Sequence, residues 1–349
     1  IVYDDEEMAE YFALHVGKQK LEHPVLIDKF LENAIEVDVD ALSDGEDVYV
    51  AGVMEHIEEA GIHSGDSSCV LPPYSLPAET VAEIERQTVA LAKELRVVGL
   101  MNIQFAVKDG VVFILEVNPR ASRTAPFVSK ATGVPLPRLA TQVMLGKTLK
   151  ELDPWSMRRS GYVSVKESVF PFRRFPGVDI LLGPEMRSTG EVMGIAPTFE
   201  EAFLKGQWGA GQKLPEGGKV FLSVNDRDKR FVAEVARQYV DLGFELLATS
   251  GTAGLLAGQG IPSTRVLKVY EGRPNIVDLI KNGEVSLVIN TASGKRTAHD
   301  SKAIRQATLH YGVPYSTTLS GAKAIARAIG AARTTEVRVK SLQEYYKGE

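Results

Sequence analysis

Alternating apolar and polar residues with a period of two predict β-strands in the first part of the chain. The clearest alternation runs over residues 34–41, and a turn signal at Asp44-Gly45 separates it from an apolar run at 48–53. A shorter apolar run at 25–27 also predicts a strand. We therefore expect an antiparallel meander in this region.

A helix and a hairpin are predicted next. Ser75 and Pro77 are typical of a helix start. Apolar residues then recur on one helical face at Val81, Ile84, Leu91 and Leu95. Two further strands, at 102–107 and 112–117, flank Asp109-Gly110. We therefore expect an α+β domain with an antiparallel sheet and helices.

The pattern changes near residue 210. A glycine-rich stretch at 205–218 predicts a linker, and apolar runs alternate with helical segments after it. The runs lie at 220–224, 245–249, 265–269, 286–290 and 313–317, with helices that include 229–242 and 301–311. Such alternation predicts a doubly wound α/β domain with a five-stranded parallel sheet. The expected organisation is a first domain at 1–205, a linker at 206–218 and a second domain at 219–349.

Composition narrows the function classes. The formal net charge of -5 argues against general nucleic-acid binding, which requires a basic face to neutralise phosphates. Cys69 is the only cysteine, so we expect it in the core of a protein from a reducing, cytoplasmic compartment. No apolar run reaches the ~18 residues of a membrane span. The first residue is not Met, and we expect the chain to be a piece of a longer protein.

A metal site is predicted at the end of the second hairpin strand. Alternation places Glu116 and Asn118 on one strand face, together with Val112 and Ile114. A three-residue loop at 109–111 would bring Gln104 opposite Glu116, whereas a two-residue loop would put the two side chains on opposite faces. Three such oxygens suit Mg²⁺, which keeps its other positions for phosphate and water. The alternative is a polar patch on an edge strand.

Two arginines follow this strand directly. Arg120 and Arg123 could form bidentate pairs with a phosphorylated or carboxylate intermediate. The alternative is a pair of solvated surface arginines. A second polar cluster at 61–68 contains His63, which could contact a ribose or phosphate, although a lone histidine is more often structural.

The carboxyl ends of the five predicted parallel strands form a second candidate site. Ligands bind beyond such ends in open parallel sheets, and a helix start after Thr249 could bind an anion. Lys229, Lys268 and two hydroxyl-bearing glycine turns meet at this rim. We expect a pocket for a small phosphate-bearing molecule, against the alternative of ordinary polar loops.

The motifs together resemble the ATP-grasp family, and specifically the carbamoyl phosphate synthetase large subunit. The resemblance lies in 37–41, 54–67, 99–105, 116–124, 129–135 and 182–194. It implies an ATP-dependent ligase unit that phosphorylates carbamate to carbamoyl phosphate for pyrimidine and arginine synthesis. It also implies the full enzyme's glutaminase small subunit as a partner. It leaves the oligomeric state open, a homo-oligomer included.

The resemblance also implies roles for individual residues. Arg120 and Arg123 would face the carbamate and the transferred phosphoryl group. The metal, Mg²⁺ or Mn²⁺, would be held by Gln104, Glu116 and Asn118. The nucleotide would be lined by Leu31, Glu36, Gly61, Ile62, His63, Ser64, Gln104 and Glu116. The activator ornithine would be received by Glu58, Asp66, Glu167 and Thr317.

The last third resembles the methylglyoxal-synthase-like domain of that subunit, which binds UMP as inhibitor and IMP as weak activator. The positions carried over are Ser223, Lys229, Thr249, Thr252, Lys268 and Asn290. Ala292 replaces a hydroxyl residue of the family pattern, which puts the identity of the effector in question. A methylglyoxal synthase is the rival, but Arg273 stands where that enzyme carries its aspartate.

Other functions stay open from the sequence. The chain lacks an upstream glycine-rich phosphate loop, so we expect the isolated polypeptide not to make carbamoyl phosphate. One alternative is a non-enzymatic module that senses nucleotide, which would bind UMP without binding ATP. Another is a biotin-carboxylase-like ligase, against which the second domain argues.

Overall fold

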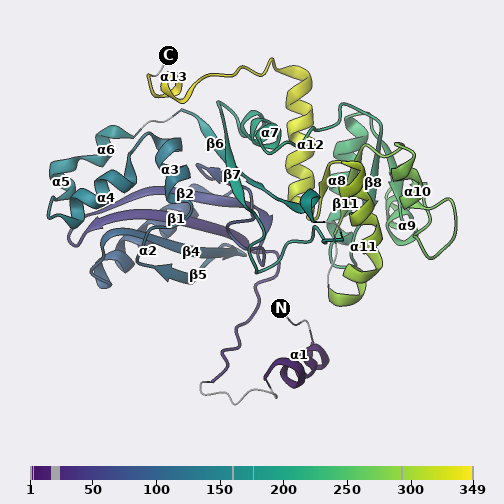
Figure 1. The fold of residues 1–349 in the computed structure, drawn as a ribbon, viewed down its shortest axis with the longest axis horizontal. Coiled ribbons are helices and arrows are strands. Elements are labelled where there is room, and N and C mark those ends of the chain that lie inside the picture. The colour runs from purple at the N-terminus through teal and green to yellow at the C-terminus, as the bar shows by residue number, and fades with distance from the viewer. Residues whose placement is uncertain are drawn as a thin grey trace.

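Two β-sheets lie next to each other in a computed structural model (Figure 1), which describes residues 2, 4–16, 24–158, 161–175, 177–291 and 294–347. For residues 16 and 294–300 only the backbone is described. The larger sheet is antiparallel, with strand order β5-β4-β1-β2-β3-β6-β7. Its strands are β1 Ile35–Asp44, β2 Val48–Glu59, β3 Cys69–Leu71, β4 Val98–Lys108, β5 Val111–Asn118, β6 Val163–Val169 and β7 Gly190–Ala196.

Helices cover the two faces of this sheet unequally. On one face α2, Ala78–Glu94, packs Ile84 against Val37 and Val39 of β1. On the other face, α3 and α4 pack against Leu42 and Met54. The helices on that side are α3 Ala125–Thr132, α4 Leu136–Met144, α5 Leu149–Leu152 and α6 Pro154–Met157. The N-terminal α1, Asp5–Tyr11, and the π-helical turn Phe12–Val16 that follows it lie apart from both sheets (Figure 1).

The β4–β5 hairpin confirms one register prediction and corrects its reasoning. Gln104 does pair with Glu116, but the loop has two residues, Asp109 and Gly110, both with positive φ. A β-bulge at Leu115 adds one residue to β5 and restores the pairing that the short loop would otherwise shift.

The bulge also changes which residues share a face of β5. Phe113, paired with Ala106, lies on the side of Glu116. Val112 belongs instead to the core beneath α2, and Ile114 pairs with Phe105 on that same face, so the predicted places of both beside Glu116 were wrong.

The second sheet is parallel and doubly wound, as predicted, with strand order β10-β9-β8-β11-β12. Its strands are β8 Lys219–Ser223, β9 Glu245–Ala248, β10 Thr264–Arg265, β11 Leu287–Asn290 and β12 Tyr315–Ser316. Helices α8 Lys229–Asp241, α9 Ser250–Gly258 and α12 Leu319–Thr334 cover one face. Helices α10 Ile276–Lys281 and α11 Gly294–Tyr311 cover the other. The C-terminal helix α13 is Leu342–Lys347.

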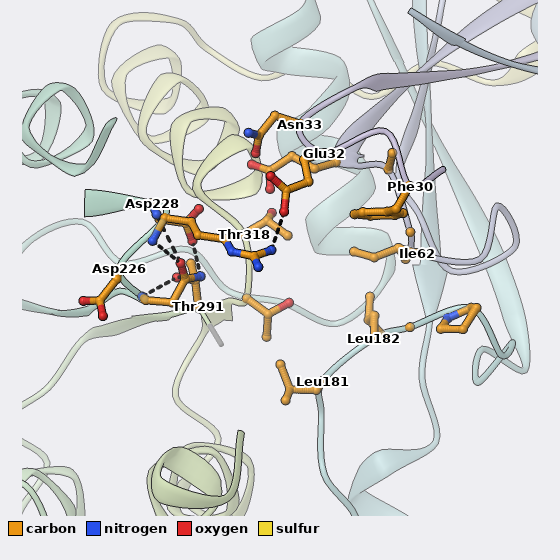
Figure 2. A pocket seen from close by; sticks show the side chains of 18 of the residues that line it. Phe30, Glu32, Asn33, Ile62, Leu181, Leu182, Asp226, Asp228, Thr291 and Thr318 are labelled. Carbon is orange, nitrogen blue, oxygen red and sulfur yellow. Dashed lines mark hydrogen bonds and ion pairs between the residues drawn. The ribbon is translucent and has the colours of Figure 1, made fainter. Parts of the chain in front are cut away.

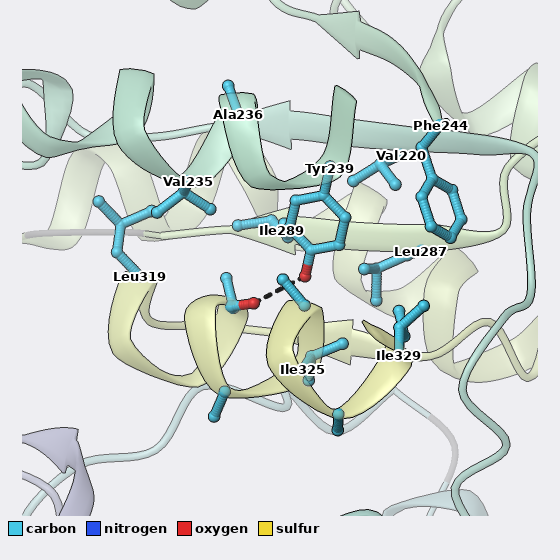
Figure 3. Close-up of a cluster of buried hydrophobic side chains, with 14 of the residues drawn as sticks. Val220, Val235, Ala236, Tyr239, Phe244, Leu287, Ile289, Leu319, Ile325 and Ile329 are labelled. Atoms are coloured by element: carbon cyan, nitrogen blue, oxygen red, sulfur yellow. Dashed lines mark hydrogen bonds between the residues drawn. The ribbon is translucent and has the colours of Figure 1, made fainter. Parts of the chain in front are cut away.

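One hydrophobic core joins the two sheets. It runs from Val165 of β6 through helix α7, Phe199–Gly209, to α12 and the inner strands of the parallel sheet. Figure 3 shows its centre, where Tyr239 of α8 donates a hydrogen bond of 2.7 Å to the Ala322 carbonyl of α12. The two halves of the chain are therefore packed against each other and not merely tethered.

Two local predictions were wrong. Residues 25–27 form no strand, because this segment precedes β1 without a pairing partner among the described residues. Residues 206–209 of the expected linker are the last turn of α7, so the irregular connection begins at Ala210. None of the helices in the described ranges is long and apolar enough to cross a membrane.

Candidate functional site

A cavity of about 810 Å³ opens on the same face of the antiparallel sheet as α3 and α4, over the part of that face that these helices do not cover. It collects side chains from β1, β4 and β5 and from the loop at 61–65. The predicted residues that line it are Glu36, Gly61, Ile62, His63, Ser64, Gln104, Glu116, Asn118, Arg120 and Arg123. Leu31 is not brought to this cavity, and its carbonyl accepts the Ala34 N–H at 3.3 Å.

The candidate metal ligands lie on paired residues of β4 and β5, and their side chains point to the same face of the sheet. Gln104 pairs with Glu116, and two residues away Asn102 pairs with Asn118. The pairing continues into β1, where Asp38 pairs with Gln104. Amide and carboxylate oxygens on one sheet face are suitable ligands for a hard divalent cation. The donor set therefore fits Mg²⁺ or Mn²⁺ chemically.

The 61–65 loop is tied to the sheet from several sides. The Gly61 N–H donates to Glu36 Oε1 at 3.1 Å, and the Gln104 amide donates to Ser64 Oγ at 3.1 Å. The His63 N–H donates to the Gly183 carbonyl at 2.8 Å. Because these bonds hold the loop over the cavity, it can offer backbone and side chains to a ligand without further ordering.

Sequence reasoning missed several residues of the cavity. Lys166 of β6 is fully buried, and its ammonium donates to the carbonyls of Ser67 at 2.7 Å and Ser64 at 3.2 Å. The sequence offered one hint, a charged residue inside the strand pattern of 163–169. The pattern alone could not show that this lysine lies near residue 64. The other missed lining residues are Asp38, Gly65, Asn102, Ser122, Thr124, Pro184, Met186, Ser188, Thr189, Gly190 and Glu191.

A buried histidine supports two carboxylates at the edge of the cavity. His56 Nε2 lies 3.0 Å from Asp38 Oδ2, and Nδ1 lies 3.4 Å from Glu36 Oε2. Burial opposes charge on the imidazole, but Cys69 and the two carboxylates together raise the pKa of His56 well above its usual value. A cationic His56 would hold both acids in fixed positions.

The two arginines differ in their surroundings. Arg120 donates to Asn118 Oδ1 at 3.0 Å and to the Ala121 carbonyl at 3.2 Å, which links it to the candidate metal ligands. Arg123 contacts the sulfur of Met186. Both arginines therefore line the cavity.

The four predicted ornithine residues converge on a separate cavity of about 80 Å³ between the two sheets. The Ser68 hydroxyl lies 2.7 Å from Glu167 Oε2 and 3.3 Å from Glu58 Oε1. Asp66 accepts backbone N–H groups of Arg187 and Ser188, each at 2.8 Å. Thr317 reaches the same cavity from the parallel sheet. This volume holds only a few water molecules.

Burial shifts the pKa values of the acids in this small cavity. It raises the pKa of Glu167 to about 8, helped by the nearby charge of Glu58. Burial also raises the pKa of Glu58. Close carboxylates that are largely shielded from solvent favour a nearby cation or a proton.

The predicted nucleotide-effector residues lie at the carboxyl ends of the parallel strands, as the topology requires. Asn290 donates to the Ser223 carbonyl at 3.1 Å, and the Thr249 hydroxyl donates to Ser223 Oγ at 3.4 Å. Thr252 Oγ1 accepts the Val224 N–H at 3.5 Å.

The two predicted lysines of this rim both interact with the Asp226 carboxylate. Lys229 pairs with Asp226 at 2.5 Å. Lys268 lies 5.8 Å from the ring of Tyr270 and favours the ionised form of Asp226. Ala292 is outside the described residues.

A third cavity of about 660 Å³ separates the two sheets near these strand ends (Figure 2). One wall is apolar, with Phe30, Leu181 and Leu182, and the opposite wall carries Asp226 and Thr291. An ion pair between Arg227 and Glu32 spans the two walls. The parallel sheet therefore touches the segment that leads into β1.

Comparisons with known proteins assign both halves of the chain. Residues 1–152 match the family described as Carbamoyl-phosphate synthase L chain, ATP binding domain, and residues 232–317 match the MGS-like domain. The carbamoyl phosphate synthase large chains of Gemmatimonas aurantiaca and Archaeoglobus fulgidus are each 54% identical, over 99% of this chain and 32% of theirs. The chain belongs to the carbamoyl phosphate synthase large-chain family. These matches confirm the resemblance to that large subunit and the predicted fold class of an α+β domain followed by a parallel-sheet α/β domain.

The chain corresponds to the C-terminal part of a carbamoyl phosphate synthase large chain. The C-terminal section from Methanocaldococcus jannaschii is 51% identical over 99% of this chain and 57% of that protein. The chain thus spans about a third of the length of the full-length relatives. A biotin carboxylase domain of a single-chain bacterial carboxylase aligns at 15% identity over 60% of this chain and 52% of that chain, with a TM-score of 0.46. That likeness is too weak to add to the assignment.

Proposed function

We propose that this chain supplies the metal-binding and nucleotide-binding half of a site that transfers a phosphoryl group from ATP to carbamate. The observation that carries the proposal is the shared sheet face of Gln104, Glu116 and Asn118, with Arg120 and Arg123 beside it. The membership in the carbamoyl phosphate synthase large-chain family supports it.

Different residues of the 810 Å³ cavity would have different roles in phosphoryl transfer. Gln104, Glu116 and Asn118 would hold a Mg²⁺ or Mn²⁺, which would supply positive charge to offset that of the phosphate groups. The 61–65 loop and Glu36 hold the nucleotide, and the arginines stabilise anionic oxygens of carbamate and of the transferred group. The net reaction is carbamate plus ATP giving carbamoyl phosphate plus ADP, and a glutaminase small subunit would be the partner of the full enzyme.

The reverse reaction tests this proposal directly. Protein of natural length should form ATP and carbamate from carbamoyl phosphate and ADP, and the reaction should require Mg²⁺ or Mn²⁺. A luciferase readout with and without a chelator measures it. Metal-independent ATP formation, or none with both substrates and metal present, would contradict the proposal.

The small acidic cavity supports ornithine as an activator, because Glu58, Asp66 and Glu167 meet there with Thr317. Ornithine carries an ammonium side chain, which three close carboxylates would attract. The cavity must enlarge to admit it, since it now holds only a few waters. Its walls come from both sheets, so such a change would move them relative to each other.

Ornithine binding should strengthen as pH rises. At pH 7 the Glu167 carboxyl, whose pKa burial raises to about 8, is mostly protonated. A cation favours the ionised form, so binding at pH 7 releases a proton, and affinity should rise about tenfold between pH 7 and pH 9. Calorimetry in buffers of different ionisation enthalpy measures both effects. Glu167→Gln should abolish the dependence while Glu216→Gln, on an exposed residue, keeps it; an unchanged slope in Glu167→Gln would contradict the role.

The parallel-sheet half is proposed to sense UMP and IMP at the strand ends that carry Ser223, Thr249 and Asn290. The matched MGS-like domain supports this proposal. Arg273, which stands in place of the methylglyoxal synthase aspartate, forms an ion pair with Asp278 at 3.0 Å. It offers no carboxylate base for that chemistry. Repeating the ATP-formation assay with UMP should lower the rate, and production of methylglyoxal from dihydroxyacetone phosphate would favour the rival enzyme.

A further inference from the structure

Asp40 stands beneath the large cavity without lining it. It lies in the middle of β1, is 1% exposed, and pairs with Asn102 of β4. Both of its oxygens are used by side chains that do line the cavity. Oδ1 accepts the Ser122 hydroxyl at 2.6 Å and the Asn102 amide at 3.1 Å, and Oδ2 accepts the Thr124 hydroxyl at 2.6 Å.

Two of these donors flank Arg123 in the chain. The segment 119–124, here called the arginine loop, connects β5 to α3. At its start the Arg120 N–H donates to the Asn118 carbonyl at 2.8 Å. At its end Ser122 and Thr124 are tied to Asp40, and the Ala125 N–H donates to Ser122 Oγ at 3.0 Å. The loop is therefore anchored once at β5 and once at β1.

Thr124 is used in an unusual way. It occupies the N-cap position of α3, where a threonine hydroxyl would normally accept a backbone N–H of the first turn. No such side-chain cap is present, and the hydroxyl donates to Asp40 instead. The bond therefore orients the arginine loop toward the sheet and does not serve to cap the helix.

We propose that Asp40 is a positioning residue that fixes the arginine loop, and through it Arg123, over the phosphoryl-transfer cavity. This inference rests on the proposed function. Asp40 acts through Ser122 and Thr124 and does not itself touch substrate. A shift of the guanidinium by about 1 Å can cost about a hundredfold in rate.

The negative charge of the buried Asp40 lowers the stability of the fold at neutral pH. A residue that served stability alone would not be expected to carry such a charge. Burial is the main cause that raises the pKa of Asp40 to about 6, against the lowering effect of its hydrogen bonds. A pKa above the unfolded value means that its contribution to stability is present at low pH and is lost as pH rises through about 6. At neutral pH the ionised carboxylate is therefore kept despite its cost.

Asp44, on the same strand, provides the matched control. Its carboxylate accepts backbone N–H groups of Glu46, Asp47 and Leu149, at 3.0, 2.7 and 2.7 Å, and it has no contact with the arginine loop. Although burial opposes it, these bonds lower the pKa of Asp44, so its ionised form stabilises the fold at neutral pH. The two aspartates should therefore respond to amide substitution in opposite ways.

The test compares Asp40→Asn with Asp44→Asn in the protein of natural length. Asp40→Asn should lower kcat for ATP formation from carbamoyl phosphate and ADP by about 10- to 100-fold. Its KM for ADP should change less than about threefold, because the 61–65 loop is untouched, and its Tm at pH 7.5 should not fall. Asp44→Asn should lower Tm and leave kcat unchanged.

Amide hydrogen exchange gives a second readout that needs no turnover. Asp40→Asn should speed exchange of the Ala125 N–H, while amides of α2 stay protected. Unchanged kcat, unchanged protection at Ala125, or a loss of Tm that accounts for the loss of rate would overturn the role of Asp40. Wild-type protein that forms no ATP would count against the proposed function alone, and exchange at Ala125 would then decide whether Asp40 fixes the loop.

Discussion

Glu116→Gln is expected to lower the rate of ATP formation from carbamoyl phosphate and ADP by at least about a thousandfold. Glu116 is the only carboxylate among the three proposed metal ligands, since Gln104 and Asn118 offer neutral amides. The variant keeps the shape of the side chain but removes the anionic ligand. A loss of about 4 kcal/mol in transition-state stabilisation corresponds to this factor.

Initial rates at increasing Mn²⁺ concentration measure the effect. Glu79→Gln is a suitable control, because Glu79 is exposed in the first turn of α2 on the opposite face of the sheet. It should match the wild type in rate and in metal dependence. A Glu116→Gln variant within tenfold of the wild type, with the same metal requirement, would show that Glu116 is not a ligand.

Gly194→Ala is expected to destabilise the protein by about 3 kcal/mol or more. A Cβ at Gly194 of β7 would lie 1.9 Å from the Ala202 carbonyl oxygen and 2.6 Å from the Gly206 nitrogen, both in the backbone of α7. Backbone atoms cannot rotate away, so α7 would have to move off the sheet. The core that joins the two sheets includes Phe203 of that helix, and its packing would be lost with it.

Gly190→Ala is the matched control for this effect. Gly190 begins the same strand, and a Cβ there would meet nothing within 4 Å. Urea unfolding should give a wild-type midpoint for Gly190→Ala and a clearly lower one for Gly194→Ala. Equal midpoints would mean that α7 and β7 can separate at little cost.

Local sequence patterns predicted the elements of the cavity better than its assembly. Periodicity located β1, β2, α2 and the β4–β5 hairpin, because apolar side chains recur with the period of each element, although both faces of β1 and β2 are largely buried. The pairing of Gln104 with Glu116 was also predicted, but from the wrong loop length. No sequence signal marked the extra residue at Leu115, since a bulge depends on how both strands twist and pair.

Long-range contacts account for most of what the sequence did not show. Lys166 reaches the 61–65 loop from a strand about a hundred residues away in the chain. Asp40 lies within the motif at 37–41, but its bonds to Ser122 and Thr124 depend on tertiary packing. The acidic cavity of Glu167 and Thr317 likewise forms only where the two sheets meet.

Because of the bulge at Leu115, the length of the hairpin's turn does not by itself decide which face of the sheet Glu116 occupies. Side chains along a strand follow an odd and even count, and one extra residue inverts that count for everything after it. If the same sequence kept its Asp109-Gly110 turn but paired without the bulge, Leu115 would lie opposite Gln104 and the Glu116 carboxylate would point toward the apolar layer under α2. The hairpin could therefore still close while its metal-binding end pointed into the wrong half of the molecule.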